Sequence, residues 1–228
     1  MARNKYPEET VDLILEVSAK LFLERGYENI TMGDIVAELG GLTRGAVYHH
    51  FKNKEDILEA VMTKMFSEND LLAKIEQEKN MTGLQKIKKL ILYSLTSTEQ
   101  QQLYTFDLSL MKNTRILARQ LEVTITELAP IIEKWIIEGY EDGSIGAEDG
   151  SIGAEDGSIG AEDSKQTAET ITLQLNFWAN PSVFLVTKKQ LISKFQYLRR
   201  LFDRLGIPII DDEVMEACLK YADNILLE

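Results

Sequence analysis

The most distinctive chemistry in this chain lies in a short basic segment near its N-terminus. Residues 43–54, TRGAVYHHFKNK, include Arg44, Lys52 and Lys54 and contain no acidic residue. The whole chain carries a formal net charge of −12 at pH 7, the wrong sign for a protein that coats nucleic acid without sequence preference. Because guanidinium and ammonium groups bind phosphates and guanine edges, the segment predicts a DNA contact confined to one small surface.

The spacing within this segment is typical of one face of a helix. Residues four positions apart lie on the same side of a helix, and two such pairs occur here: Arg44 with Tyr48, and Gly45 with His49. We expect Val47 and Phe51 to point inward, so the two pairs lie on faces that turn away from the core and can meet DNA.

Each residue of this face has a predicted role. Arg44 can donate two hydrogen bonds to guanine or hold a phosphate, and Gly45 has no side chain to keep the backbone off the duplex. Contacts to phosphates are expected from Tyr48, His49 and Lys54. The alternative is that Tyr48 and the histidines only pack the small domain, and for His50 the two interpretations stay open.

The elements before residue 80 should place this face. Apolar spacing and end signals predict four helices, at residues 7–26, 31–40, 43–51 and 53–79. The side chains that can cap their N-termini are Thr31 with Asp34, Thr43, and Asn53 with Asp56. Residues 31–51 therefore have the two helices and the glycine-containing turn of a helix-turn-helix, which lays its second helix in the major groove.

Residues 31–58, TMGDIVAELGGLTRGAVYHHFKNKEDIL, closely resemble the DNA-binding region of the tetracycline-repressor (TetR) family of bacterial regulators. The resemblance implies an all-helical homodimer, usually a repressor, in which a small-molecule effector bound in a second domain changes the affinity for operator DNA. The DNA-binding residues that it implies are Thr31, Thr43, Arg44, Gly45, Ala46, Tyr48, His49, His50 and Lys54. The chain departs from the family at Gly33, where some members carry a base-reading side chain, and in a turn that is one residue longer.

The rest of the chain is also predicted to be helical. Stripes of apolar residues predict helices near residues 84–95, 99–111, 117–135, 168–178, 191–205 and 214–225, and no segment shows strand alternation. Pro130 should kink the third of these. The fold class is all-α, with a helix-turn-helix domain at residues 1–53 and a regulatory and dimerisation domain at residues 54–228.

One segment is an exact tandem repeat. EDGSIGA occurs three times without a break, at residues 141–147, 148–154 and 155–161, and Glu162-Asp163 follow. Two glycines and one isoleucine in seven residues are a poor basis for a helix or a core, so we predict an acidic, flexible loop at residues 141–163. The alternative is a segment that binds a cation or a partner through its carboxylates.

Two further sets of residues are predicted in the second domain. Aromatic residues that could line an effector pocket, or simply belong to the core, are Phe66, Tyr93, Tyr104, Phe106, Trp135 and Trp178. By resemblance to the family, the helices near residues 164–180 and 188–205 form the dimer interface. The candidates there are Ile171, Leu175, Trp178, Leu191, Phe195, Leu198 and Phe202.

Other classes of function have little support in the sequence. Two adjacent histidines, the single cysteine Cys218, and the lack of a phosphate loop or nucleophile elbow argue against an enzyme, a metal site or a cofactor. No apolar run could span a membrane or serve as a signal peptide, so a cytoplasmic location is expected. We predict a sequence-specific regulator, a repressor that a small-molecule effector releases from its operator. The alternatives are an activator of the same fold and a helical adaptor with vestigial DNA binding.

Overall fold

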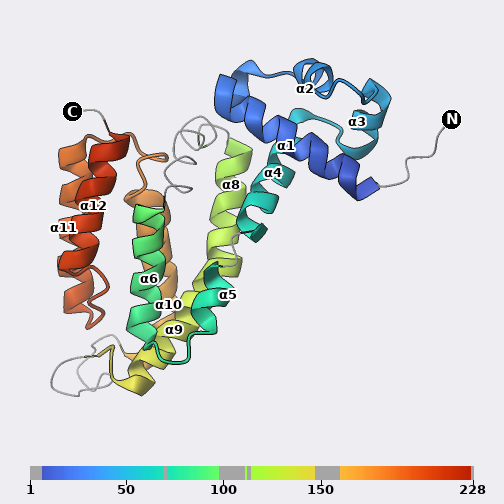
Figure 1. Ribbon diagram of the computed structural model, residues 1–228. Coiled ribbons are helices and arrows are strands. Elements are labelled where there is room, and N and C mark those ends of the chain that lie inside the picture. The colour runs from blue at the N-terminus through green and yellow to red at the C-terminus, as the bar shows by residue number, and fades with distance from the viewer. Residues whose placement is uncertain (1–6, 69–70, 98–110, 112–113, 147–159, 227–228) are drawn as a thin grey trace. The chain divides into compact units, whose positions relative to one another are not determined.

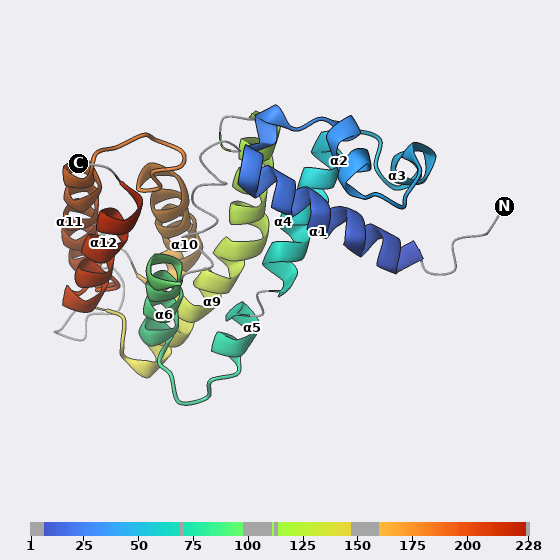
Figure 2. The same ribbon diagram turned by 45° about the horizontal axis from the view of Figure 1, so that its top comes forward.

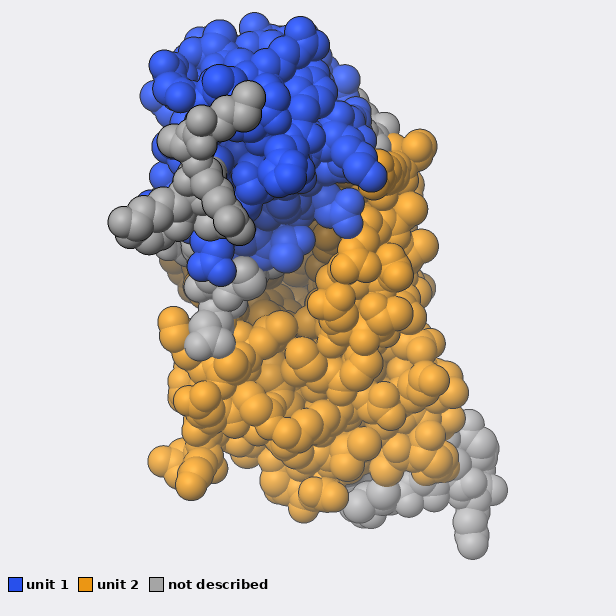
Figure 3. All heavy atoms as spheres, turned by 90° about the vertical axis from the view of Figure 1, so that its right-hand side faces the viewer, with its two compact units in different colours: residues 1–70 blue, residues 71–228 orange. Residues whose placement is uncertain are grey.

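A computed structural model describes residues 7–68, 71–97, 111, 114–146 and 160–226 (Figure 1), and in these residues the regular elements are all helices. The chain divides into two compact units, Met1–Asp70 and Leu71–Glu228, which Figure 3 colours separately. The division falls later than residue 53 because the fourth helix packs against the first. No helix of the described residues combines the length and the apolarity needed to cross a bilayer.

The first unit contains four α-helices and one short 3-10 helix. In chain order they are α1 (Pro7–Arg25), η1 (Tyr27–Asn29), α2 (Met32–Glu38), α3 (Arg44–His50) and α4 (Lys54–Glu68). Their shared core is fully buried and includes Ile14, Phe22, Ile35, Val47, Ile57 and Leu58. The burial of Val47 and of Phe51 confirms the inward positions that helical spacing predicted for the third helix.

Helix α4 is shorter than the sequence predicts. It ends at Glu68, and a separate helix, α5 (Leu71–Glu76), begins the second unit. The prediction of one helix to about residue 79 is therefore wrong.

The second unit is a helical bundle. After α5 come α6 (Gly83–Thr96), α8 (Thr114–Val123), the π-helix η2 (Thr124–Leu128), α9 (Ala129–Asp142), η3 (Ala161–Asp163), α10 (Ser164–Leu173), the π-helix η4 (Gln174–Trp178), α11 (Lys188–Arg204) and α12 (Asp212–Ile225). Helix α9 packs against α6 and α10, and α12 packs against α6 and α11 (Figures 1 and 2). The helix predicted at residues 99–111 lies outside the described residues except for Met111, which is buried.

The helix that contains Pro130 continues through a π-helical turn. Residues 114–142 are helical without a break, and η2 immediately precedes the first turn of α9, where Pro130 lies. Proline has no backbone N–H to donate, so a regular α-helical ladder cannot continue through this position. A π-helix widens the turn there, which is one of the known ways in which helices accommodate such a break.

The repeat is ordered at its beginning, contrary to the prediction of a flexible loop at residues 141–163. Ile145 is 3% exposed and belongs to the core of the second unit. Its N–H donates to the Gly139 carbonyl at 2.9 Å, and the Gly146 N–H donates to the Gly206 carbonyl at 2.9 Å. Gly143 ends α9 in the left-handed region with φ of 76°, which glycine adopts without strain.

The other described end of the repeat is ordered as well. Gly160 is buried and its N–H donates to the Asp163 carboxylate at 3.2 Å, at the start of η3. The flexible-loop prediction is therefore wrong for residues 141–146 and 160–163, and its middle part lies outside the described residues. One isoleucine is enough to anchor the first unit of the repeat because the core of the second unit accommodates it, which the composition of the repeat does not reveal.

Candidate nucleic-acid interface

Helix α2 is fixed at its start by reciprocal hydrogen bonds. The Asp34 N–H donates to the Thr31 hydroxyl oxygen at 3.2 Å, while the Thr31 N–H and hydroxyl donate to the Asp34 carboxylate at 2.8 and 2.6 Å. These bonds, the hydroxyl's first, hold the pKa of Asp34 below its usual value. The predicted capping box is confirmed, and it fixes where the chain enters the helix-turn-helix.

Helix α3 is anchored on its inner side and capped by Thr43. The Ala46 N–H donates to the Thr43 hydroxyl oxygen at 3.2 Å, as the sequence predicts. Val47 and Phe51 are buried, so this helix of seven residues is held by the core of its own unit. In the turn before it, Gly40 has φ of 54°, a backbone conformation that favours glycine.

The outer side of α3 presents the predicted donors to solvent. Most of the predicted DNA-binding residues are exposed: Thr31, Thr43, Arg44, Gly45, Tyr48 and His49. Ala46, His50 and Lys54 are half-buried. The guanidinium carbon of Arg44 lies 5.3 Å from the centre of the Tyr48 ring. The rings of His49 and His50 meet edge to face with centres 5.3 Å apart.

Lys54 has a structural contact that the sequence did not reveal. Its ammonium donates to the Tyr27 carbonyl at 2.8 Å and lies 4.0 Å from the centre of the Tyr27 ring. Tyr27 is buried against Phe22. Lys54 therefore ties the start of α4 to η1, and no local spacing rule links residues 27 and 54. An ammonium carries three donors, so two of them are left for a phosphate.

The turn before α4 completes the basic end of the unit. The Asp56 N–H donates to the Asn53 side-chain oxygen at 2.8 Å, which confirms the predicted cap. Lys52 is exposed, and its N–H donates to the Asp56 carboxylate at 3.3 Å. Lys52 was part of the basic segment but not of the predicted DNA-binding set, and its exposure adds a cation beside α3.

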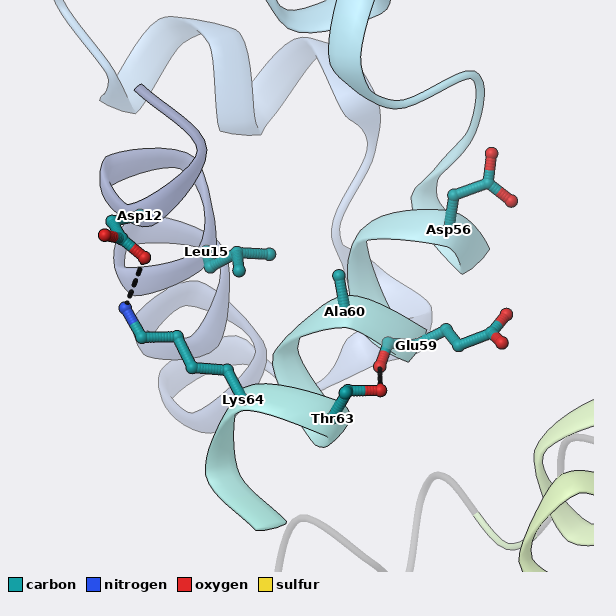
Figure 4. Close-up of a pocket in the computed structure, with 7 residues that line it drawn as sticks. All are labelled: Asp12, Leu15, Asp56, Glu59, Ala60, Thr63 and Lys64. Atoms are coloured by element: carbon teal, nitrogen blue, oxygen red, sulfur yellow. Dashed lines mark hydrogen bonds and ion pairs between the residues drawn. The ribbon is translucent and has the colours of Figure 1, made fainter. Parts of the chain in front are cut away.

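A groove of about 530 Å³ between α1 and α4 has the opposite charge (Figure 4). Its lining residues are Asp12, Leu15, Asp56, Glu59, Ala60, Thr63 and Lys64. The Lys64 ammonium is 2.9 Å from the Asp12 carboxylate and 3.9 Å from that of Glu16. Carboxylates outnumber the single lysine in this groove, so it repels phosphate and leaves the α3 side as the surface suited to DNA.

Three of the six predicted pocket residues have described side chains. Trp135 is fully buried, and its indole N–H donates to the Glu76 carboxylate at 2.7 Å. Hydrogen bonds from Lys134 and then Trp135 hold the pKa of Glu76 below its usual value. Tyr93 and Trp178 are half-buried. The side chain of Phe66, and Tyr104 and Phe106 entirely, lie outside the described residues.

The predicted dimer residues lie mostly inside the chain's own core. Five of them are buried: Ile171, Leu191, Phe195, Leu198 and Phe202. Leu175 and Trp178 are half-buried and pack against that core. The five buried residues therefore belong to the core of their own subunit, whereas Leu175 and Trp178 keep part of their surface for a partner.

The same helices and the loop between them also place large apolar side chains at the surface: Phe184, Leu185 and Tyr197 are exposed, and half-buried Trp178 lies beside Tyr197. We define the aromatic patch as Trp178, Phe184, Leu185 and Tyr197. Leu185 is 80% exposed and Tyr197 is 52% exposed, and the Trp178 and Tyr197 rings meet edge to face at 5.8 Å. The Lys194 ammonium lies 5.0 Å from the Trp178 ring centre, and desolvation lowers its pKa.

The geometry defines an all-helical protein whose first unit carries a helix-turn-helix. Residues 14–61 match the family model of bacterial regulatory proteins of the tetR family. The HTH-type transcriptional repressor DhaR of Mycobacterium sp. strain GP1 is 32% identical over 142 residues, which are 58% of this chain and 68% of DhaR. The chain belongs to the TetR family.

Other relatives match over a shorter part of the chain. The HTH-type transcriptional regulator TtgR of Pseudomonas putida is 38% identical over 86 residues, 37% of this chain. The match spans 40% of the length of TtgR, and the same share of ArpR, a probable HTH-type transcriptional regulator of the same species.

Solved structures share the fold over nearly the whole chain. A TetR-family transcriptional regulator from Pectobacterium atrosepticum has a TM-score of 0.61 at 21% identity, with 90% of this chain and 98% of that one covered. A TetR transcription regulator from Haloarcula marismortui has a TM-score of 0.55 at 14% identity, with 96% and 99% covered.

Proposed function

We propose that this protein is a sequence-specific DNA-binding regulator, a repressor that a small-molecule effector releases from its operator. The observation that carries the proposal is the outer side of α3, where Arg44, Tyr48 and His49 are exposed without any acidic neighbour on the helix. In a chain of net charge −12, a basic surface without carboxylates suits an anionic partner such as DNA. The names of DhaR and BepR, both transcriptional repressors, support repression over activation.

The roles within this surface follow from exposure and chemistry. Arg44 at the first position of α3 can donate two hydrogen bonds to a guanine edge, and Gly45 lets the backbone approach the duplex. Thr31, Thr43, His49 and Lys52 stand at positions suited to phosphates. Lys54 serves both the fold, through Tyr27, and a phosphate, through its remaining donors.

Two copies of the chain should act together. A recognition helix of seven residues contacts few base pairs, and dimers of helix-turn-helix proteins gain affinity by placing two such helices about 34–36 Å apart. We place the dimer contact on the aromatic patch, because apolar side chains as exposed as Leu185 and Tyr197 gain free energy when a partner covers them.

The dimer proposal is tested by sedimentation at micromolar concentration. The double variant Leu185→Ser, Tyr197→Ser should shift the protein from dimer to monomer. The control is Leu219→Ser on α12, which removes an exposed apolar side chain outside the patch and should leave the dimer intact. A wild-type protein that sediments as a monomer, or a patch variant that stays dimeric, would overturn the assignment.

The effector is proposed to bind in the second unit and to favour the DNA-free form. Linkage then requires that operator DNA weaken effector binding by the same factor by which the effector weakens DNA binding. Trp135 and Trp178 are the two tryptophans of the chain and both lie in this unit, so their fluorescence can screen for effectors. Calorimetry with and without operator measures the coupling, and equal affinities in the two titrations would exclude an inducer.

The DNA-binding proposal itself has a direct test. A pool of randomised duplexes is incubated with the protein, bound sequences are enriched, and the affinity for the selected duplex is measured by fluorescence anisotropy. The double variant Arg44→Ala, Tyr48→Ala should lose most of that affinity. The control variant Lys189→Ala removes an exposed cation from α11 and should bind as the wild type does. Undiminished binding by the double variant would refute the proposal.

A further inference from the structure

Arg44 and Tyr48 form a pair on the exposed side of α3. The guanidinium carbon lies 5.3 Å from the Tyr48 ring centre, within the range of a cation–π contact. Both residues are exposed, one turn of helix apart. No acidic residue occurs on α3, and among the described residues Arg44 has no ion pair. The contact that the structure shows for the Arg44 guanidinium is therefore the Tyr48 ring.

A ring is an unusual partner because it leaves the donors of arginine unoccupied. The five N–H groups of a guanidinium lie in its plane, while an aromatic ring attracts the group through its face. A carboxylate in the same place would accept the in-plane hydrogen bonds that a base edge needs. Tyr48 can thus restrict the orientation of Arg44 without competing with DNA for it.

Such restriction matters because arginine is flexible. Its side chain has about 2 kcal/mol of rotamer entropy to lose when it is fixed, and a side chain already held near its bound orientation loses less on binding. The gain appears only for a contact that requires one orientation. A bidentate pair to guanine requires it, whereas a charge beside a phosphate does not.

We propose that Tyr48 is a positioning residue for Arg44, and that the pair reads a guanine in each operator half-site. This inference rests on the proposed function and assigns the aromatic ring of Tyr48, and not its hydroxyl, to specificity. The phenol hydroxyl as a phosphate donor is the competing role, and the two roles predict different patterns of binding.

The experiment uses the full chain and the duplex selected from the random pool. The guanine is located as the position in one half-site where Arg44→Ala abolishes the preference for guanine over adenine. Discrimination is the ratio of the affinities for the guanine duplex and the adenine duplex. It is then measured for Tyr48→Phe, Tyr48→Leu and Tyr48→Met, each with Arg44 present and with Arg44→Ala, and thermal melts check that each variant is folded.

The positioning role predicts one pattern. Tyr48→Phe keeps the ring and should keep the discrimination. Tyr48→Leu and Tyr48→Met should lower it by about 2- to 5-fold, the size of an exposed cation–π contact, and should have no effect on it when Arg44 is already alanine. Tyr48→Met keeps the inference testable if the leucine variant fails to fold.

Several results would overturn the inference and leave the proposed function standing. An equal loss on both duplexes for Tyr48→Phe and Tyr48→Leu would assign the hydroxyl to a phosphate. A Tyr48→Leu effect on discrimination that persists beside Arg44→Ala would separate the two residues. Retained guanine preference at every position in Arg44→Ala would show that Arg44 reads no base. Failure of the wild type to enrich any duplex would instead refute the proposed function.

Discussion

Residues 31–50 and residues 141–146 are both short, glycine-containing segments, but their sequences predict their structures with very different success. In the first, caps and apolar spacing specify two helices, and the structure has them. In the second, glycine and acidic residues indicate a flexible loop, yet Ile145 is buried and Asp142 accepts a hydrogen bond from the Gly83 N–H at 2.8 Å. The difference lies in how far away the partners are along the chain. The capping bonds of the first segment join residues three positions apart, whereas Asp142 and Gly146 in the second bond to Gly83 and Gly206, about 60 residues away.

The largest expected effect is that of Gly83→Ala in the second unit, and Gly45 in the helix-turn-helix is the glycine with which it is compared. A Cβ on Gly83 would overlap the backbone of Trp135 and Gly139, where α6 crosses α9, whereas a Cβ on Gly45 would meet only the Thr43 hydroxyl at 3.9 Å. Gly83→Ala should therefore destabilise the second unit by more than about 3 kcal/mol, since backbone cannot move aside as a side chain can. Denaturant unfolding followed by tryptophan fluorescence measures this loss.

Gly45→Ala serves as the matched control. Alanine favours a helix by up to about 1 kcal/mol over glycine, so this variant should be at least as stable as the wild type. Its Cβ would however stand between α3 and the duplex, so DNA affinity should fall. A Gly83→Ala protein as stable as the wild type would show that α6 and α9 do not touch as closely as the structure has them.

The second prediction concerns the isoleucine that the loop prediction overlooked. Ile145→Ala should reduce the free energy of unfolding of the second unit by about 2–3 kcal/mol, since the substitution removes three buried carbon atoms and leaves a cavity beside Gly139. Urea titration monitored by tryptophan fluorescence is the measurement, with Ile137→Ala, an exposed residue of α9, as the control. Equal stability of the two variants would restore the flexible-loop interpretation.

The features that the sequence predicted and those it did not can be separated by the same criterion. Thr31, Thr43 and Asn53 cap helices whose first turns follow them directly, so these helix starts can be predicted from neighbouring residues. The contact of Lys54 with Tyr27, and that of Asp142 with Gly83, join chain segments that only the fold brings together. The apolar stripe of α11 does not distinguish a core from a dimer interface, because both require the same spacing of apolar residues.

The third prediction is a pH dependence from Asp142. Burial opposes ionisation of this carboxyl group, but hydrogen bonds from Ser144 and Gly83 and the charge of Lys86 outweigh it and hold the pKa below its usual value. A carboxyl whose pKa is lower in the folded state stabilises the fold above its unfolded pKa and loses that contribution as the pH falls through the folded value.

Asp142→Asn tests this dependence. The variant should be less stable than the wild type by about 1 kcal/mol near pH 7, the usual worth of a side chain that caps a helix. The difference should begin to shrink below about pH 4, the usual pKa of an aspartic acid, and should disappear as the pH falls through the lower folded pKa, where the wild-type carboxyl also becomes neutral. Urea titrations at pH 7 and well below pH 4 measure this difference in the free energy of unfolding. A difference that does not change with pH would mean that the charge of Asp142 is irrelevant to its contact with α6.

The smallest effect is expected from removing one repeat unit. Because the three EDGSIGA units are identical, deletion of any one of them produces the same chain. That chain still has one unit to follow α9, with its Ile145 and Gly146 contacts, and one unit to supply the Gly160 position before η3. The deletion halves the chain length between Gly146 and Gly160, which changes a closure free energy by only about 0.6 kcal/mol, so stability and DNA affinity should stay close to the wild type.

Removal of two units is the informative counterpart. The single remaining Gly-Ala pair would have to occupy the place of Gly146, bonded to Gly206, and also that of buried Gly160 at the start of η3. One residue cannot fill two positions, so the second deletion should cost clearly more stability than the first. Equal, negligible losses for both deletions would show that the ordered ends of the repeat contribute nothing to the fold. A large loss from the first deletion would show that the middle unit has a role of its own.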